Sequence, residues 1–161
     1  MLVRPAVSAD AEAIRSIYNV EVTTSTVTFD LEPRTPTEQL EWLERRSGAH
    51  AVLVAERDGE IVGFASLSPY RDRPAYATSV EDSVYVDHAH QGEGVGRALL
   101  TALLDVAAKH GFHMVMARIV GGHEASISLH RSLGFTTIGT EREVGRKFGR
   151  WLDVLLMQKL L

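Results

Sequence analysis

A glycine-rich segment, Gln91 to Arg97 (QGEGVGR), separates a short apolar run from a leucine-rich run and limits what this chain can fold into. The residues before it, Val84 to Val86, are typical of a strand, and those after it, Ala98 to Leu104, are typical of a helix. Glycines let backbone N–H groups approach an anion closely, and the following helix adds its unpaired N–H groups and positive dipole end. The segment predicts a phosphate-binding strand–loop–helix unit. A turn that needs glycine only for steric reasons is the alternative.

The spacing of the glycines excludes the two most common nucleotide-binding motifs. Gly92, Gly94 and Gly96 follow the pattern G-x-G-x-G, whereas a dinucleotide fold requires G-x-G-x-x-G. Gly96 is followed by Arg97 and not by the Lys-Ser/Thr of a nucleoside triphosphate loop. A pyrophosphate is the ligand that we expect.

Composition narrows the class of protein. The 161 residues, 45% of them hydrophobic, suit one domain over residues 1–161 with a single ordinary core. The chain has no cysteine, which excludes disulfides, thiolate metal sites and a cysteine-bound intermediate. A net charge of −4 gives no basic footprint for nucleic acid. No apolar run reaches the roughly 18 residues of a membrane span, so we expect a soluble cytoplasmic protein that binds no membrane.

The order of elements predicts a mixed, mostly antiparallel α+β sheet flanked by helices. Asp58-Gly59 marks a tight hairpin. Thr35, Pro36 and Glu38 form a capping box for one helix, and Ser8 is the expected N-cap of another. The predicted strands are 2–7, 51–57, 60–70, 77–88, 113–120, 135–144 and 151–161, and the predicted helices are 11–22, 35–46, the run from the glycine segment to 110, and 124–133.

The pattern Gln91-x-x-Gly94-x-Gly96 between a strand and a helix resembles the acetyl-coenzyme A loop of the GNAT acetyltransferase superfamily. The order of elements is similar to that fold over nearly the whole chain. The resemblance implies acetyl-CoA as co-substrate and no metal. It implies that the backbone of Val84 to Val86 binds the pantetheine arm, and that His123 stands where the family usually has an asparagine. The implied coenzyme-binding residues are Val84, Tyr85, Val86, Gln91, Gly92, Glu93, Gly94, Val95, Gly96, Arg97 and His123.

Three further segments resemble the phosphinothricin and methionine sulfoximine N-acetyltransferase branch: VEDSVYV, ASISLHRSLGF and VGRKFGRWLDVLLMQ. This resemblance implies acetylation of the α-amine of a small amino acid or analogue, a role in detoxification, and a homodimer formed in part by residues 144–153. The alternative for that segment is a long hairpin loop that packs Phe148 and Trp151 into the core.

Acetyl transfer to an amine requires a base, a polarised carbonyl and a proton for the thiolate. Glu81 is the predicted base, and alternation places it on one strand face with Ser83 and Tyr85. A solvated strand residue is the alternative role for Glu81. Asp82 then falls on the apolar face, and a β-bulge would relieve it. The resemblance implies such a bulge, with a backbone N–H that polarises the acetyl carbonyl.

His130 is the predicted proton donor to the thiolate, because the branch has histidine at this position and histidine titrates near neutrality. A buried core histidine is the alternative. Seven helical residues separate His123 from His130 by roughly 10 Å, which is too far for one metal ion.

The resemblance places Phe29, Arg71 to Arg73 and Glu81 to Ser83 around the acceptor. Arginines suit a carboxylate or phosphinate. Asp72 departs from such a clamp, and Phe29 has a core role as its alternative. Without a cysteine to carry the acetyl group, direct attack in a ternary complex is favoured. Two other functions remain: acetylation of another small amine or a protein N-terminus, and acetyl-CoA sensing without turnover.

Overall fold

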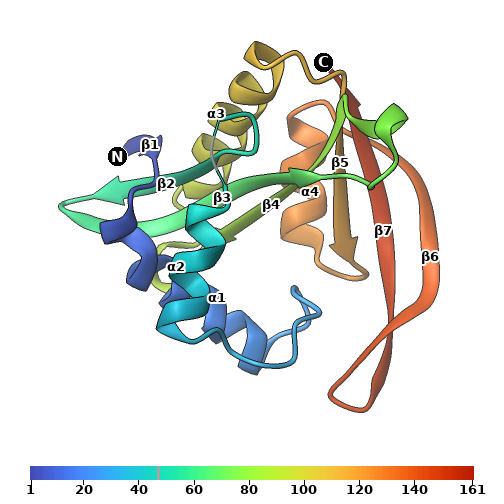
Figure 1. The fold of residues 1–161 in the computed structure, drawn as a ribbon. Coiled ribbons are helices and arrows are strands. Elements are labelled where there is room, and N and C mark those ends of the chain that lie inside the picture. The colour runs from blue at the N-terminus through green and yellow to red at the C-terminus, as the bar shows by residue number, and fades with distance from the viewer. Residues whose placement is uncertain (47) are drawn as a thin grey trace.

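The computed structural model describes residues 1–46 and 48–161, which form seven strands and four α-helices (Figure 1). The strands are β1 (Leu2–Pro5), β2 (Val52–Arg57), β3 (Glu60–Pro69), β4 (Ser79–Val86), β5 (Met114–Val120), β6 (Thr136–Lys147) and β7 (Arg150–Leu160). The helices are α1 (Ala11–Thr24), α2 (Pro36–Glu44), α3 (Val95–Lys109) and α4 (Glu124–Ser132). The strand order is β1-β2-β3-β4-β5-β7-β6, and every neighbouring pair is antiparallel except β4 and β5. The predicted mixed, mostly antiparallel α+β fold is confirmed.

Apolar side chains cover both faces of the sheet. On one face Leu99 and Leu103 of α3 and Ile127 of α4 pack with buried residues of β2 to β5 and β7. On the other face Ile14 and Tyr18 of α1, together with α2, pack on β2 and β3. Side chains alternate between the two faces along each strand, so adjacent residues of β4 point to opposite faces of the sheet.

Local sequence signals mark most element ends correctly. The Thr35 hydroxyl accepts from the Glu38 N–H at 3.2 Å, and the Glu38 carboxylate accepts from the Thr35 N–H at 2.7 Å, as the capping box predicts. Asp58 and Gly59 adopt φ of 51° and 83°, which confirms the β2–β3 hairpin. Ser8 as N-cap of α1 is wrong. It opens a 3₁₀ turn, Ser8–Asp10, and α1 begins one residue after Asp10.

The alternative of a long hairpin loop over residues 144–153 is wrong. β6 continues to Lys147 and β7 begins at Arg150, so only Phe148 and Gly149 form the turn, with φ of 51° and 71°. Two residues with positive φ suit the tight turn of a twisted hairpin, which the glycine at the second position allows. Phe148 and Trp151 are 56% and 60% exposed, so neither packs into the core.

The β4 and β5 strands diverge, and this divergence creates the space for the site. Their parallel pairing covers only Ser79–Glu81 opposite Met114–Met116, after which the strands separate (Figure 1). The predicted bulge in β4 is absent, because pairing with β3 runs without a register shift from Val80 to Val86. Asp82 is accommodated by a side-chain partner instead, which is described below.

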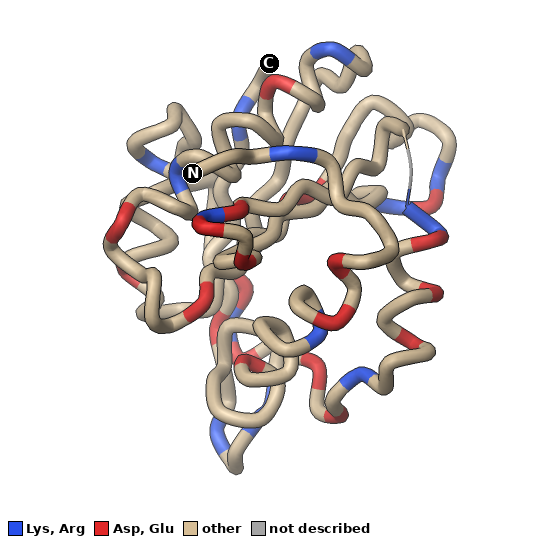
Figure 2. The backbone as a smooth tube through the Cα atoms, turned by 90° about the vertical axis from the view of Figure 1, so that its left-hand side faces the viewer, with Lys and Arg blue, Asp and Glu red and all other residues tan. Residues whose placement is uncertain are grey.

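Two global properties accompany this fold. Among the described residues no helix combines the length and the apolarity that a membrane span requires. Basic and acidic positions are interspersed along the chain in the view of Figure 2, in keeping with the net charge of −4.

Candidate active site

A cavity of about 730 Å³ lies where β4 and β5 separate. It is open to both faces of the sheet, since its wall includes Glu81 and Arg118 from the α1 face and Val84, Ala117 and Leu129 from the α3–α4 face. The other lining residues come from the loop after α1, the glycine segment and the start of α4; they are Glu21, Val27, Thr28, Phe29, Asp82, Ser83, Tyr85, Val86, His88, His90, Gln91, Gly92, Gly94, Val95, Gly96, Arg97, Ile119, Val120, His123, Ala125, Ser126, His130 and Val154.

The glycine segment forms a backbone cradle at one end of this cavity. Gly92 and Gly94 have φ of 77° and 83°, and a side chain at either would meet no atom within 4 Å. The first intrahelical bond of α3 runs from the Ala98 N–H to the Gly94 carbonyl at 3.1 Å, so the N–H groups of Gly94 to Arg97 have no intrahelical acceptor. These four residues line the cavity. A Cβ on Gly96 would lie 3.3 Å from Leu129, so glycine also permits close packing of α3 and α4. The cradle fits a pyrophosphate.

Glu93 belongs to the same segment but turns away from the cavity. Its carboxylate pairs with Arg57 of β2 and lies 3.2 Å from His90 Nδ1. These contacts hold the pKa of Glu93 below its ordinary value. The structure therefore brings the other predicted residues of Gln91–Arg97 to the cavity, but not the Glu93 side chain.

Two residues of β4, Val84 and Val86, have backbone groups that do not pair with β3 and lie along the cavity. The Asp87 N–H donates to the Val62 carbonyl at 2.9 Å, which sets the alternation of the antiparallel pair. By that alternation the N–H and C=O groups of Val84 and Val86 point away from β3, toward the side from which β5 has departed. Tyr85 differs: its backbone faces β3, and its ring stacks on Phe64 at 5.1 Å between centroids.

Glu81 lies half-buried on the α1 face of the cavity, with Ser83 and Tyr85 on the same face as predicted. Burial raises the pKa of the Glu81 carboxyl above its ordinary value, although the nearby guanidinium of Arg118 opposes this. Arg118 itself pairs with Glu141 of β6 at 2.6 Å. A carboxyl with a raised pKa beside a cavity has the properties of a general base for an amine.

Asp82 and His130 form a buried pair on the opposite face. Their side chains are joined by a 2.9 Å contact between His130 Nε2 and Asp82 Oδ2, and His130 Nδ1 lies 2.8 Å from the carbonyl oxygen of Ser126. Burial disfavours the charged imidazole, but the hydrogen bond and charge of Asp82 outweigh it, and the pKa of His130 is raised. Asp82, which the sequence places on the apolar face of β4, is thus paired with a residue 48 positions away. No local sequence signal indicates this partner.

His123 lies at the N-cap of α4 and lines the cavity. Burial lowers the pKa of its imidazole, so the neutral form is favoured there. Within residues 1–46 and 48–161 no group of three or more His, Cys, Asp or Glu side chains is arranged to hold a metal ion.

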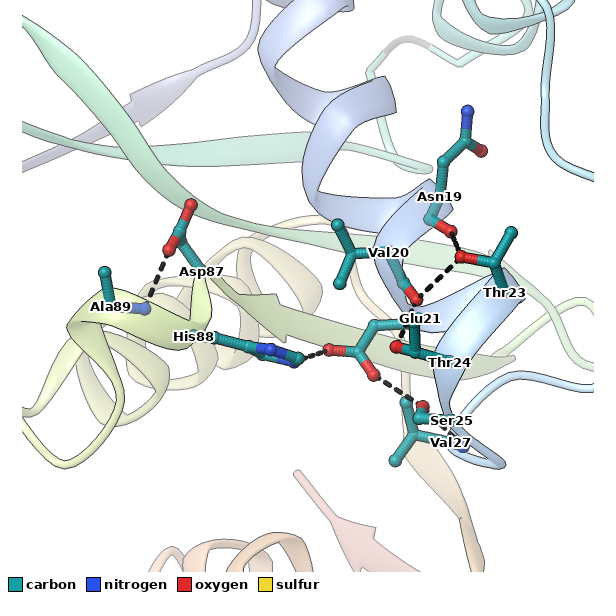
Figure 3. Close-up of polar contacts among 10 residues, drawn as sticks. All are labelled: Asn19, Val20, Glu21, Thr23, Thr24, Ser25, Val27, Asp87, His88 and Ala89. Atoms are coloured by element: carbon teal, nitrogen blue, oxygen red, sulfur yellow. Dashed lines mark hydrogen bonds and ion pairs between the residues drawn. The ribbon is translucent and has the colours of Figure 1, made fainter.

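Glu21 and His88 form a second pair at the cavity that sequence reasoning missed. Glu21 is 7% exposed on α1, and its carboxylate accepts from His88 Nε2 at 2.5 Å and from the Ser25 hydroxyl at 2.5 Å (Figure 3). The pair joins the end of α1 to the turn that precedes the glycine segment. A charged residue on the apolar side of a helix pattern was the available signal.

The predicted acceptor residues separate into two groups. Phe29 is 40% exposed and lines the cavity against Gly145 of β6, so it is no core residue. Arg71, Asp72 and Arg73 are exposed in the β3–β4 loop and do not line the cavity. Arg71 instead lies 5.1 Å from the ring centroid of Tyr70. Arg118, a lone charge in the apolar run MVMARIV, is the arginine that the structure brings beside Glu81.

Comparisons with known proteins give one consistent result. A sequence model described as "Acetyltransferase (GNAT) domain" matches residues 3–156. The chain is 44% identical to a phosphinothricin N-acetyltransferase of Streptomyces coelicolor, over 99% of this chain and 95% of that protein. It is 42% identical to an L-methionine sulfoximine/L-methionine sulfone acetyltransferase of Salmonella typhimurium, over 98% and 93%.

Solved structures agree with the sequence comparisons. A GNAT superfamily phosphinothricin acetyltransferase from Sinorhizobium meliloti in complex with AcCoA superimposes with a TM-score of 0.95 at 37% identity, over 99% of this chain and 88% of that one. A ribosomal-protein-alanine N-acetyltransferase from Brucella melitensis has a TM-score of 0.98 at 43% identity, with full coverage of both chains at 100%.

Proposed function

The chain belongs to the GNAT acetyltransferase family, and we propose that it moves the acetyl group of acetyl-CoA to the α-amine of a small amino acid or analogue of the phosphinothricin, methionine sulfoximine or methionine sulfone type. Detoxification of such analogues is the corresponding role. We further propose that residues 1–161 act as one catalytic domain in the cytoplasm.

The observation that carries this proposal is the cavity that joins the two faces of the sheet. One end has the anion cradle and the open backbone groups of Val84 and Val86, which suit the pyrophosphate and pantetheine of the coenzyme. The other end has Glu81, Ser83 and Phe29, which suit an amine acceptor. A thioester that enters from the first side meets an amine from the second where β4 and β5 separate.

In the proposed reaction Glu81 takes a proton from the acceptor amine, directly or through a water, and the neutral nitrogen attacks the carbonyl carbon. A backbone N–H of β4 on the open side stabilises the oxyanion. His130 gives a proton to the sulfur as the carbon–sulfur bond breaks. Since the chain has no cysteine, the acetyl group passes to the amine without a protein thioester.

Arg118 supports recognition of the acceptor's carboxylate or phosphinate, because it lines the cavity on the same side as Glu81. Arg71 to Arg73 stay predicted acceptor residues, and they reach the acceptor only if their loop moves or another subunit contributes it. Arg118→Gln separates the two predictions. It should raise KM for amino acids at least tenfold while leaving KM for acetyl-CoA within about twofold. An unchanged acceptor KM would favour the loop arginines.

A thiol-release assay with a panel of amines tests the function directly, and the absence of protein cysteine removes the background. Phosphinothricin, methionine sulfoximine and methionine sulfone should each release coenzyme A, whereas acids that lack the α-amine should not. If coenzyme binds but no amine in the panel gives release, an acetyl-CoA-sensing module replaces the enzyme. The similarity to the Brucella structure makes a peptide with an N-terminal alanine the necessary additional substrate, because it would reveal protein N-terminal acetylation.

We also propose a homodimer that uses the β6–β7 hairpin. Five large apolar side chains of this hairpin are about half exposed or more: Ile138, Val144, Phe148, Trp151 and Leu160, at 48%, 50%, 56%, 60% and 60%. Exposed aromatic residues on a projecting hairpin are typical of an association surface. Phe148→Ser combined with Trp151→Ser should give a monomer by light scattering, while an unchanged mass would exclude this surface.

A further inference from the structure

Asp82 and His130 are the most deeply buried pair of titratable side chains at the cavity. Asp82 is 6% exposed and His130 is 4% exposed. Asp82 shares its strand face with Val80, Val84 and Val86, so its carboxylate has an apolar setting. An ionised carboxylate is costly in such a setting unless it is paired and hydrogen-bonded. His130 Nε2, at 2.9 Å, supplies this partner.

The contacts of the imidazole determine how many protons it holds. The Ser126 carbonyl oxygen, 2.8 Å from Nδ1, can only accept, so Nδ1 carries a hydrogen. An ionised Asp82 can also only accept, so a proton must lie between Nε2 and Oδ2 as well. A neutral imidazole has one N–H and cannot satisfy both acceptors. The geometry therefore requires one proton more than neutral His130 beside ionised Asp82 would have.

We propose that Asp82 is a positioning residue that keeps this additional proton on His130 at neutral pH, for delivery to the departing thiolate. The inference rests on the proposed function, in which His130 is the proton donor. During turnover the amine nitrogen bonds to the carbonyl carbon, the carbon–sulfur bond breaks and Glu81 accepts the amine proton. Sulfur accepts the Nε2 proton of His130, which leaves its hydrogen bond to Asp82. Glu81 then releases a proton to water and His130 regains one from water, so the cycle balances.

The surroundings of His130 leave Asp82 as the charge that favours the imidazolium. On its own helix, His123 at the start of α4 opposes a second positive charge nearby. The Phe135 ring, which comes just before β6, meets the imidazole edge-on at 4.9 Å and is apolar. The raised pKa of His130, despite its burial, agrees with dominance by Asp82.

A proton NMR titration of the full native chain tests this, with the His130 signal assigned by its loss in His130→Gln. We expect the titration midpoint to lie above the ordinary histidine value of about 6.5. Asp82→Asn keeps an oxygen that accepts from Nε2 but removes the charge, so it should lower the midpoint by about one pH unit or more. The alkaline limb of kcat should move down by the same amount. Asp105→Asn, the same change on the exposed side of α3, should move neither.

Several results would overturn the proposal. One is a native midpoint at or below 6.5, and another is an Asp82→Asn midpoint that equals the native one. A lowered midpoint with an unmoved kcat profile would make the pair structural only. If Asp82→Asn does not fold, the native titration and the smaller neutral variant Asp82→Ser decide. If no amine is acetylated but the midpoints behave as expected, the proposed function fails while proton storage by Asp82 stands.

Discussion

Replacing Glu81 with glutamine should separate activity from stability. The substitution keeps the shape of the side chain and removes its ability to take a proton. A general base contributes about 10²- to 10⁴-fold to a rate, so kcat should fall by that factor, which corresponds to about 2.7–5.4 kcal/mol of activation free energy. KM for acetyl-CoA should change little, because Glu81 lies on the α1 face and the cradle lies on the other.

The thermal stability of the Glu81→Gln variant should not fall with its activity. Burial raises the pKa of Glu81 in the folded chain, so the folded state holds the proton more tightly than the unfolded state does. The protonated carboxyl therefore contributes stability at low pH, and this contribution is lost as pH rises through the raised pKa. At pH 7 the ionised carboxylate is a cost that glutamine removes, and Glu81→Gln should unfold at the same temperature as the native chain or higher.

Steady-state thiol release from pH 5 to 9 and thermal unfolding at pH 5 and 7 measure both effects. The native kcat/KM should fall on the acid side with an apparent pKa above that of an ordinary glutamate, and this limb should disappear in the variant. Glu60→Gln, at the exposed start of β3, is the matched control and should change neither quantity. Variant activity within about threefold of native at every pH would refute Glu81 as the base.

Three other changes test the frame around the site. Gly63→Ala would put a Cβ 2.9 Å from a backbone carbonyl oxygen of β4, which cannot move aside, so urea unfolding should show a loss of about 1–3 kcal/mol, and a neutral effect would contradict this packing. Gly145→Ala would put a Cβ into the Phe29 ring, which must then shift. Acceptor KM should rise about tenfold, equivalent to about 1.4 kcal/mol, with kcat less affected, and an unchanged KM would remove Phe29 from the acceptor site. His88→Ala leaves the buried Glu21 carboxylate with one partner fewer, so unfolding free energy should fall by about 1–3 kcal/mol, whereas no loss would show that water replaces the imidazole.

The parts of the structure that depend on neighbouring residues could be predicted from the sequence. The capping box at Thr35 and the Asp58-Gly59 turn act within four residues, and both appear as expected. The glycine cradle is also local, because positive φ at Gly92 and Gly94 and the start of α3 follow from consecutive residues. Ser8 failed as a cap because Asp10, held by Arg4 at 2.8 Å, sets the start of α1.

The parts that depend on distant residues could not be predicted. Asp82 and His130 are 48 residues apart, and Glu21 and His88 are 67 apart. Each looks like an isolated charge within an apolar pattern until the fold brings its partner near. The predicted bulge was a local way to accommodate Asp82 on the apolar face of β4. It is absent because His130 of α4 hydrogen-bonds to Asp82 instead.

Strand alternation explains how two opposed chemical tasks occupy consecutive positions of β4. Glu81 points to the α1 face and Asp82 to the α3–α4 face, so the two carboxylates share a backbone but not an environment. Glu81 is half-buried, and within residues 1–46 and 48–161 no side chain hydrogen-bonds to its carboxylate, which suits it to gain a proton. Asp82 has His130 at 2.9 Å, which suits it to keep a proton on the imidazole. A shift of one residue in the register of β4 would exchange the faces and put each carboxylate on the wrong side of the cavity. The regular pairing of β4 with β3 is therefore what assigns proton removal to one side of the sheet and proton delivery to the other.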